Sequence, residues 1–412
     1  MRGIILTILM LTIGRVAVNM TRRFPYPFVP SIARQLSVSV PVVQSIIALQ
    51  ASAGLASPVF GPLSERYRRK YVMISVLWVM SAAAFFAALV PGLWVFAVVM
   101  LIFGLGKVIY DPAMYAYMGD SVPYRRRGMA LGFGELSWAG SLLIAAPVAG
   151  LLLSRSDVGN ITAIMLNHAG GAAYIDLLTH AAGLQAVFLF LGVSCLIGGL
   201  LILAFVRGYP PNPAFASAGL SPRMVWRVMR SNPAALAGVL YALFVSSSNE
   251  VLFINYGLFM EERFGLTLAL LGSLTVIISA AEVLGEFFVI GVADRIGLRR
   301  TTLAGIAVAT LTYLVIPFSP TLTVALGLLF VLFLGVEIAI VSSIPLFTEI
   351  LPDNRAIMMS SVAGAAGVGR VLGAMVGGII IALTGSFTVA GITATIISAM
   401  AFLVLWRYVD ID

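Results

Sequence analysis

Residues 71–90 read YVMISVLWVMSAAAFFAALV, twenty consecutive residues without a charged side chain. A helix of roughly 20 apolar residues spans the hydrocarbon core of a bilayer. The ten residues before this run, GPLSERYRRK at 61–70, contain four basic side chains and one carboxylate. A basic loop next to a long apolar run is typical of the cytoplasmic edge of a membrane protein. Residues 61–90 therefore predict a cytoplasmic loop followed by a spanning helix.

The rest of the 412-residue chain has the same character, being 60% hydrophobic and only 10% charged, with a mean hydropathy of +1.05. A soluble domain carries about 25% charged residues. Helices satisfy their backbone polar groups internally, which makes them the expected structure for apolar runs of this length in lipid. We therefore predict an all-α polytopic membrane protein with twelve transmembrane helices, at residues 4–29, 41–63, 71–90, 92–118, 128–153, 184–206, 234–260, 267–292, 301–318, 321–347, 357–383 and 387–408.

The distribution of basic residues predicts how the chain is oriented in the membrane. If both termini are cytoplasmic, seventeen of the 25 Lys and Arg residues fall on the cytoplasmic side, and only Arg34, Arg155 and Arg263 fall outside. This asymmetry follows the positive-inside rule. It also explains the net charge of +8 without a nucleic-acid partner. We expect a multi-pass protein of a prokaryotic inner (plasma) membrane, with N- and C-termini cytoplasmic.

Two acidic segments recur along the chain at one spacing. Glu65-Arg66 is repeated as Asp294-Arg295, and Asp120 is matched by Glu349; the separations, 294 − 65 and 349 − 120, are both 229. A constant offset predicts two pseudo-symmetric six-helix bundles, residues 1–206 and 234–412, joined by a Pro- and Arg-rich cytoplasmic linker at 207–233. Residues 154–182 predict an insert on the outer surface. Repeats of this kind are expected to place a substrate site between the halves.

The loop motifs carry a family resemblance. The segment GPLSERYRRK at 61–70 resembles the loop signature of the major facilitator superfamily, and residues 290–300 resemble its second-half copy. Phe24-Pro-Tyr-Pro-Phe28 resembles the end of helix one in twelve-helix drug:proton antiporters. The resemblance implies a secondary transporter working by alternating access. It also implies a cytoplasmic gate built from Gly61, Glu65, Arg66, Arg69, Asp120, Arg127, Asp294, Arg295, Arg299 and Glu349.

Eleven ionisable residues lie inside the predicted helices. Each costs roughly 2.5–3.5 kcal/mol at the centre of a helix that faces lipid, so we expect them to pair or to line a polar cavity. The predicted substrate-cavity residues are Arg15, Asn19, Arg22, Arg23, Tyr26, Lys107, Asp111, Glu135, Trp138, Asn249, Glu250, Glu337 and Arg370. Pairs between the halves, such as Arg22 or Arg23 with Glu250, and pairs within each half are both possible.

Three of the acids are the predicted proton-coupling residues. Glu282 and Glu286 are one helical turn apart, so repulsion between their charges favours proton binding by one of them. Glu135 ranks after this pair. The alternative is that Arg370 neutralises Glu282 and Glu286 in a purely structural role.

These observations favour proton-coupled efflux of small amphipathic or drug-like solutes. The Arg/Lys-rich first half also allows a transporter or exchanger of an anionic metabolite. A non-transporting membrane sensor or assembly protein is the remaining alternative. No catalytic constellation is recognisable, so we do not expect an enzyme. We expect no cofactor and no metal site, and the expected partners are the lipid bilayer, a small-molecule substrate and protons, in a monomer.

Overall fold

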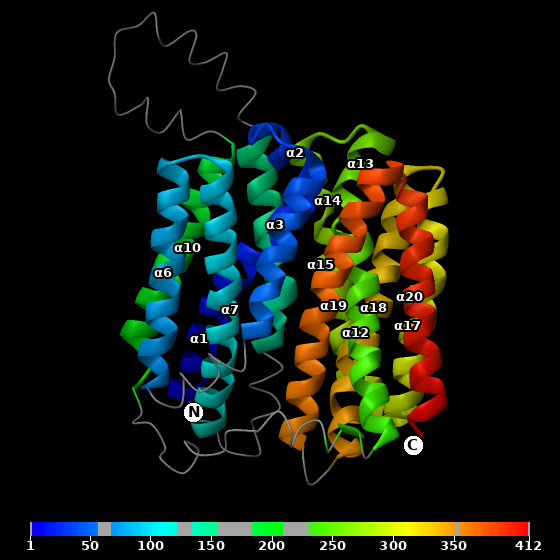
Figure 1. Ribbon diagram of the computed structural model, residues 1–412. Helices are drawn as coiled ribbons and strands as arrows, with labels where there is room; N and C mark the ends of the chain where they lie inside the picture. Colours follow the sequence, from blue (N-terminus) through cyan, green and yellow to red (C-terminus); the bar gives the residue numbers. More distant parts are fainter. Residues whose placement is uncertain are drawn as a thin grey trace, which may run out of the picture. The chain divides into compact units, whose positions relative to one another are not determined.

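The computed structural model describes residues 2–56, 67–121, 134–154, 183–208, 227, 229–230, 232–351 and 355–410. The regular secondary structure in these ranges is entirely helical (Figure 1). Eleven of the described helices are long and apolar enough to cross a membrane, and a shorter apolar helix covers Val40–Ala56. The predicted all-α, multi-pass membrane fold is thereby confirmed.

The chain divides into two compact units. The first unit comprises Met1–Ala216 and Met260–Val276, and the second comprises Ser217–Phe259 and Ile277–Asp412. Most of the predicted linker 207–233 and of the predicted insert 154–182 lies outside the described residues, so both stay predictions.

The helices of the first unit are α1 (Arg2–Arg23), α2 (Pro25–Gln35), α3 (Val40–Ser52) with the short 3-10 turn η1 (Ala53–Ala56), α6 (Arg69–Leu89), α7 (Leu93–Ser121), an unlabelled helix Gly134–Ser154, α10 (Leu184–Phe205) and α14 (Leu268–Leu274). The second unit contains α12 (Pro233–Phe253), α15 (Val276–Phe288), the π-helical turn η3 (Val289–Ala293), α16 (Asp294–Ile296), α17 (Leu298–Val315), η4 (Ile316–Phe318), α18 (Leu322–Ile350), α19 (Arg355–Thr384) and α20 (Phe387–Tyr408). Helix α13 (Tyr256–Phe264) crosses the border between the units.

The first spanning segment is broken where the sequence predicted one helix over residues 4–29. Helix α1 ends at Arg23, and Phe24 still donates its N–H to Met20 O at 3.1 Å. Pro25 has no N–H to continue this ladder, so a second helix, α2, begins there. The break leaves Arg22 and Arg23 in the last turn of α1.

Corresponding helix crossings in the two units use positions that match to within one residue. In the first unit, the Tyr110 hydroxyl of α7 donates to Leu11 O of α1 at 3.0 Å. In the second unit, the Tyr241 hydroxyl of α12 donates to Ala339 O of α18, also at 3.0 Å. Subtracting the repeat offset of 229 places Ala339 at position 110 and Tyr241 at position 12. A tyrosine hydroxyl therefore bonds the same pair of helices in both units. In the first unit the tyrosine lies on α7, and in the second it lies on α12, the counterpart of α1.

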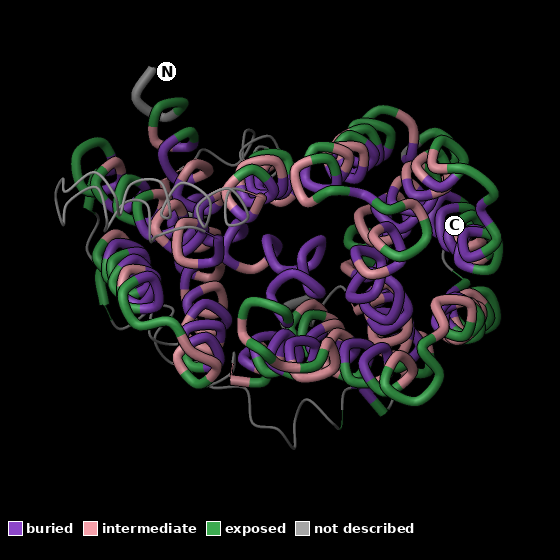
Figure 2. The backbone as a smooth tube through the Cα atoms, turned by 90° about the horizontal axis from the view of Figure 1, so that it is seen from above, coloured by how far each residue is buried: buried purple, intermediate pink, exposed green. Residues whose placement is uncertain are grey.

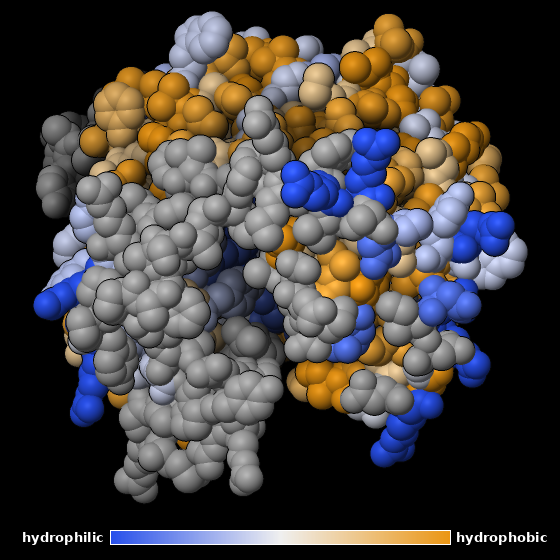
Figure 3. Space-filling view, turned by 60° about the horizontal axis from the view of Figure 1, so that its bottom comes forward, coloured by the Kyte–Doolittle hydropathy of each residue, from blue (hydrophilic) through white to orange (hydrophobic). Residues whose placement is uncertain are grey.

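Within each unit, the helices turn their buried faces toward one another and their exposed faces outward (Figure 2). Phe188 of α10 is surrounded by Phe24, Phe96 and Phe103, with ring centroids 6.0–6.3 Å away. Large apolar side chains such as Trp94 and Leu383 are 80% exposed. Orange hydrophobic side chains cover the visible sides, and blue hydrophilic ones gather on the end that faces the reader in Figure 3. This distribution suits a surface surrounded by lipid.

Close packing of α12 against α19 depends on particular glycines. A Cβ added at Gly369 would lie 2.2 Å from Leu243 O, and one at Gly373 would lie 2.4 Å from Ser247 O. Such contacts allow two helices to approach at backbone distance, as is common in membranes. By contrast, a Cβ at Gly367, on the same helix, would meet nothing within 4 Å among the described residues.

Candidate substrate and coupling site

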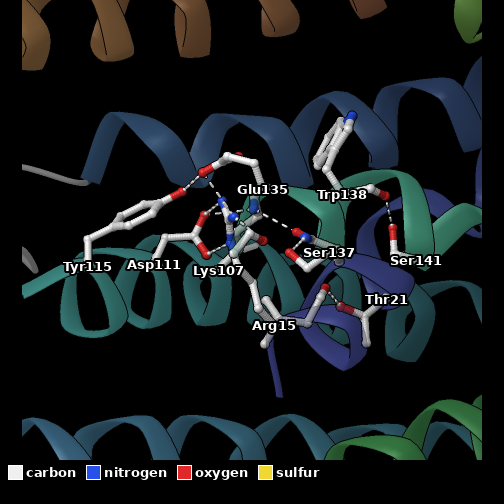
Figure 4. A network of polar contacts seen from close by, with 12 residues as sticks. Arg15, Thr21, Lys107, Asp111, Tyr115, Glu135, Ser137, Trp138 and Ser141 are labelled. Atoms are coloured by element: carbon white, nitrogen blue, oxygen red, sulfur yellow. Dashed lines mark hydrogen bonds and ion pairs between the residues drawn. The ribbon is translucent and has the colours of Figure 1, made fainter. Parts of the chain in front are cut away.

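A network of charged side chains joins α1, α7 and the helix Gly134–Ser154 in the interior of the first unit (Figure 4). Arg15 is at its centre and is 4% exposed. Its Nε donates to Asp111 Oδ1 at 3.1 Å, and its Nη1 donates to Gly134 O at 2.9 Å. The same Nη1 is 3.1 Å from Glu135 Oε1. One guanidinium thus contacts two carboxylates and a backbone carbonyl, a geometry that its planar fork of donors suits.

Lys107 and Asn19 extend this network along α7 and α1. Lys107 Nζ donates to Asp111 Oδ2 and to Asn19 Oδ1, both at 2.7 Å. The Asn19 amide in turn donates to Ser137 Oγ at 3.1 Å. Lys107 and Asp111 are one turn apart, so α7 itself brings them together. Asp111 therefore accepts from two cations, on two different helices.

The Trp138 ring lies among three further cationic contacts. The guanidinium carbon of Arg23 is 4.3 Å from the ring centroid and that of Arg22 is 6.0 Å away, while Lys107 Nζ is at 5.4 Å. Arg23 Nη1 also donates to Trp138 O at 2.8 Å. An indole face attracts cations electrostatically at these distances. The uncharged Trp138 ring therefore stabilises cationic side chains in the membrane region although it carries no negative charge.

The interior of the first unit has more positive than negative groups. The network in the described part of this unit holds four cations, Arg15, Arg22, Arg23 and Lys107, and two acids, Asp111 and Glu135. Within the described part of this unit, Arg22 has no carboxylate partner. A positive excess in a region of low dielectric constant favours the entry of anions.

The second unit carries a group of buried carboxylates on α15 and α18. Glu282 and Glu286 are 3% and 5% exposed, and Glu337 is 8% exposed. A Cβ at Gly285, on the turn between the two α15 acids, would lie 2.9 Å from Glu337 Cβ. The missing side chain at 285 therefore lets Glu337 approach α15 beside Glu282 and Glu286. The π-helical turn η3 begins immediately after α15, and such turns often mark functional sites.

The remaining predicted cavity residues lie in different surroundings. Tyr26 is buried in α2, and Glu250 is buried in α12 with its Cβ opposite Gly373. Asn249 Oδ1 is buried without a hydrogen-bond partner among the described residues. Arg370 is half-buried on α19.

Several predicted gate residues cannot be placed, because Gly61, Glu65, Arg66 and Arg127 and the side chains of Asp120 and Asp294 lie outside the described residues. The others have defined positions. Arg69 Nη1 donates to Ala116 O of α7 at 2.8 Å, and Arg299 Nη2 donates to Trp406 O of α20 at 3.0 Å. Arg295 and Glu349 are exposed. Arg69 and Arg299 therefore bind carbonyls near helix ends within their own units, and the gating role stays a prediction.

Three partners in the network were missed by sequence reasoning. Tyr115 donates its hydroxyl to Glu135, Ser137 accepts from Asn19, and Gly134 contributes its carbonyl. Tyr115 follows Asp111 by four residues, as Asp111 follows Lys107, so the helical spacing could have indicated it. The Gly134 carbonyl carries no signal in the sequence, because every residue has one.

Comparison with known proteins gives this arrangement its context. The family model described as Major Facilitator Superfamily matches residues 11–254 and 239–411. The chain belongs to this superfamily. The family and the fold together indicate a transporter, embedded in the membrane by multiple spans.

Individual relatives of this transporter are distant. It is 26% identical to the uncharacterized MFS-type transporter YwfA of Bacillus subtilis over 149 residues, which is 36% of each chain. It is 25% identical to the multi-drug resistance efflux pump PmrA homolog of Lactococcus lactis, over 85% of this chain and 82% of that one. A crystal structure of a bacterial homolog of the human lysosomal transporter Spinster, inward-facing and occupied, covers 97% of this chain with a TM-score of 0.74 at 15% identity. That likeness concerns the fold alone.

The described residues offer no site for a metal ion, since they contain no suitable group of three or more His, Cys, Asp or Glu side chains. The charged groups of the network can bind a proton, exchange an ion pair or hold a charged solute.

Proposed function

We propose that this superfamily member is a secondary active transporter that exports small amphipathic or drug-like solutes by alternating access, in exchange for protons. We place it in a prokaryotic plasma membrane with both termini cytoplasmic, as the loop arginines favour. The observation that carries the proposal is the ion-paired network of Arg15, Lys107, Asp111 and Glu135 inside a membrane-spanning bundle. Ionisable groups are expensive in that position, and they mark ion and substrate pathways in membrane proteins.

Charge provides the coupling in this proposal. When a carboxylate of the network binds a proton, one negative charge disappears from a region that is already rich in positive groups. A cationic solute then binds more weakly, so proton and solute compete for the same site. Competition between two ligands is the thermodynamic requirement for exchange. The name of the Lactococcus lactis relative, an efflux pump, is in line with export.

A second candidate is a transporter of an anionic metabolite, and the excess of positive groups in the first unit favours it. Arg22 has no carboxylate partner in the described part of that unit, and it lies 6.0 Å from the Trp138 ring centroid. An acidic group of a solute beside Arg22 would reduce the positive excess of this unit by one charge. For an anion, proton binding strengthens solute binding, so the two would move together and not in exchange.

The direct test uses proteoliposomes with an imposed pH gradient and two competing probes, the cationic dye ethidium and the organic anion carboxyfluorescein. Proton exchange predicts that ethidium moves against the proton flow and that collapse of the gradient reduces its rate at least tenfold. The anion candidate predicts that carboxyfluorescein moves with the protons. Liposomes without protein give the background leak. If neither probe nor any related solute moves faster than this background, both candidates fail.

The buried acids of the second unit give a further expected result. The membrane region of that unit holds Glu250, Glu282, Glu286 and Glu337 against one guanidinium, Arg370, among its described residues. Ionisable groups in membrane helices mark ion and proton pathways, and Glu282 and Glu286 are buried one helical turn apart on α15. We expect Glu282→Gln and Glu286→Gln, made singly, to lower gradient-driven transport about tenfold or more in at least one case.

The matched control for these variants is Glu262→Gln, which removes an exposed glutamate of α13 that belongs to neither set of predicted residues. This variant should transport at the wild-type rate. Full gradient-driven transport by both α15 variants would mean that these acids are structural, as pairing with Arg370 would make them.

A further inference from the structure

Tyr115 is a residue of the network to which the proposed function gives no role. Its hydroxyl donates to Glu135 Oε1, the same oxygen that lies 3.1 Å from Arg15 Nη1. The guanidinium carbon of Arg15 is also 5.0 Å from the centroid of the Tyr115 ring. Figure 4 shows the phenol of α7 and the guanidinium of α1 meeting at one carboxylate of the helix Gly134–Ser154. Two donors from two different helices thus share a single acceptor oxygen.

The two carboxylates of the network are held in different ways. Asp111 has a cation on each oxygen, Arg15 at 3.1 Å and Lys107 at 2.7 Å, and its side chain is 18% exposed. Glu135 has one cation and one neutral hydroxyl, and its side chain is 43% exposed. A proton from water therefore reaches Glu135 more easily, and it displaces one ion-pair contact there instead of two.

We infer that Glu135 is the exchangeable carboxyl group of the first unit, and that Tyr115 is the positioning residue that holds it when Arg15 is released. The inference rests on the proposed proton coupling and names the residues that perform it. One proton binds a carboxylate oxygen of Glu135, and only hydrogen bonds and an ion pair change. Arg15 keeps Asp111 and Gly134 O as acceptors, so its charge stays compensated in both states.

The remaining charged groups around Glu135 in the first unit define what proton binding does there. Arg15, Lys107, Asp111 and Glu135 sum to zero when all are ionised, and to +1 when Glu135 holds a proton. Arg22 and Arg23 beside Trp138 add further positive charge. With these two arginines the group carries a net charge of +2 when Glu135 is ionised and +3 when it holds a proton, so protonation increases the repulsion of cations. Tyr115 keeps Glu135 within reach of Arg15, so that the pair re-forms when the proton leaves.

A role in holding the carboxyl group can be separated from a role in holding the fold. Tyr110, on the same helix α7, is fully buried and donates its hydroxyl to the backbone carbonyl of Leu11 at 3.0 Å. Tyr110→Phe therefore removes a hydroxyl of equal size that touches no carboxylate, and it is the matched control for Tyr115→Phe.

The test measures two rates in proteoliposomes for whichever of ethidium and carboxyfluorescein the wild-type protein carries: solute exchange without a pH gradient, and net transport driven by the gradient. Exchange needs no net proton movement, so the ratio of driven to exchange rate reports coupling alone. We expect this ratio to fall at least tenfold in Glu135→Gln and at least threefold in Tyr115→Phe. Tyr110→Phe should leave the ratio at the wild-type value, whatever its absolute rates.

The inference is overturned if Tyr115→Phe and Tyr110→Phe have the same ratio, or if Glu135→Gln remains driven by the gradient as the wild type is. Those results would leave the proposed function intact, because the wild-type protein would still transport. If the wild type itself shows neither exchange nor driven transport of either probe, the proposed function fails, and the inference fails with it.

Discussion

Replacement of Asp111 by Asn should abolish gradient-driven transport and lower the free energy of unfolding by about 3–5 kcal/mol, the usual cost of removing one partner from a buried ion pair. Asp111 accepts from Arg15 at 3.1 Å and from Lys107 at 2.7 Å. The substitution leaves both cations in the membrane interior with one carboxylate, Glu135, and otherwise with neutral acceptors: Asn19, Gly134 O and the amide oxygen at position 111. Denaturant unfolding in detergent measures the loss.

A second substitution separates charge from packing. Lys107→Met removes the cation whose ion-pair partner is Asp111. The double variant Lys107→Met with Asp111→Asn therefore keeps one cation, Arg15, paired with one carboxylate, Glu135. We expect it to be more stable than Asp111→Asn alone, with an interaction energy of about 1–3 kcal/mol in the double-mutant cycle. Additive effects of the two substitutions would contradict the network, as would an Asp111→Asn variant with wild-type stability.

Gly369→Ala should lower the stability of the protein, whereas Gly367→Ala should leave it unchanged or raise it. A Cβ at position 369 would lie 2.2 Å from Leu243 O, a backbone atom of α12, so the two helices must separate. Overpacking of this kind costs about 1–3 kcal/mol. At position 367 nothing among the described residues lies within 4 Å, and alanine is a better helix former than glycine by about 0.8–1.0 kcal/mol.

Thermal unfolding in detergent compares these two variants directly, because they lie two residues apart on the same helix and make the same chemical change. A lower midpoint for Gly369→Ala and an equal or higher one for Gly367→Ala is the expected pair of results. Midpoints that fall equally in both variants would mean that α12 and α19 do not cross at Gly369.

Some features of the fold could be predicted from the sequence because they depend on composition and spacing. Apolar length located the spanning helices, and Lys107 and Asp111, two of the predicted cavity residues, form an ion pair as expected of charged groups inside a membrane. The offset of 229 reappears in the tyrosine contacts of Tyr110 and Tyr241. The break at Phe24 was not predicted, because the apolar run continues through residues 24–29 and hydropathy was the criterion. Pro25, which has no backbone N–H, was the signal for the break.

Other features depend on how each helix is rotated against its neighbour, and the sequence contains little information about this. Gly367 and Gly369 look alike in the sequence, yet only the second meets another helix. Several acids in the sequence could pair with Arg15. To predict that its partners are Asp111 and Glu135, the relative positions of three helices must be known. The repeat itself does not supply them: the offset of 229 takes Arg15 and Asp111 to Phe244 and Ile340, so the ion pairs have no copy in the second unit.

The central claim is that the charge network of the first unit couples solute movement to proton movement. It is tested most directly by recording the pH inside proteoliposomes when a transported solute is added outside, with no gradient imposed. The wild-type protein should show a solute-dependent proton flux that is at least tenfold smaller in Glu135→Gln and in Asp111→Asn. A solute that crosses without any change in internal pH, or a flux that both variants retain at the wild-type rate, would contradict the claim.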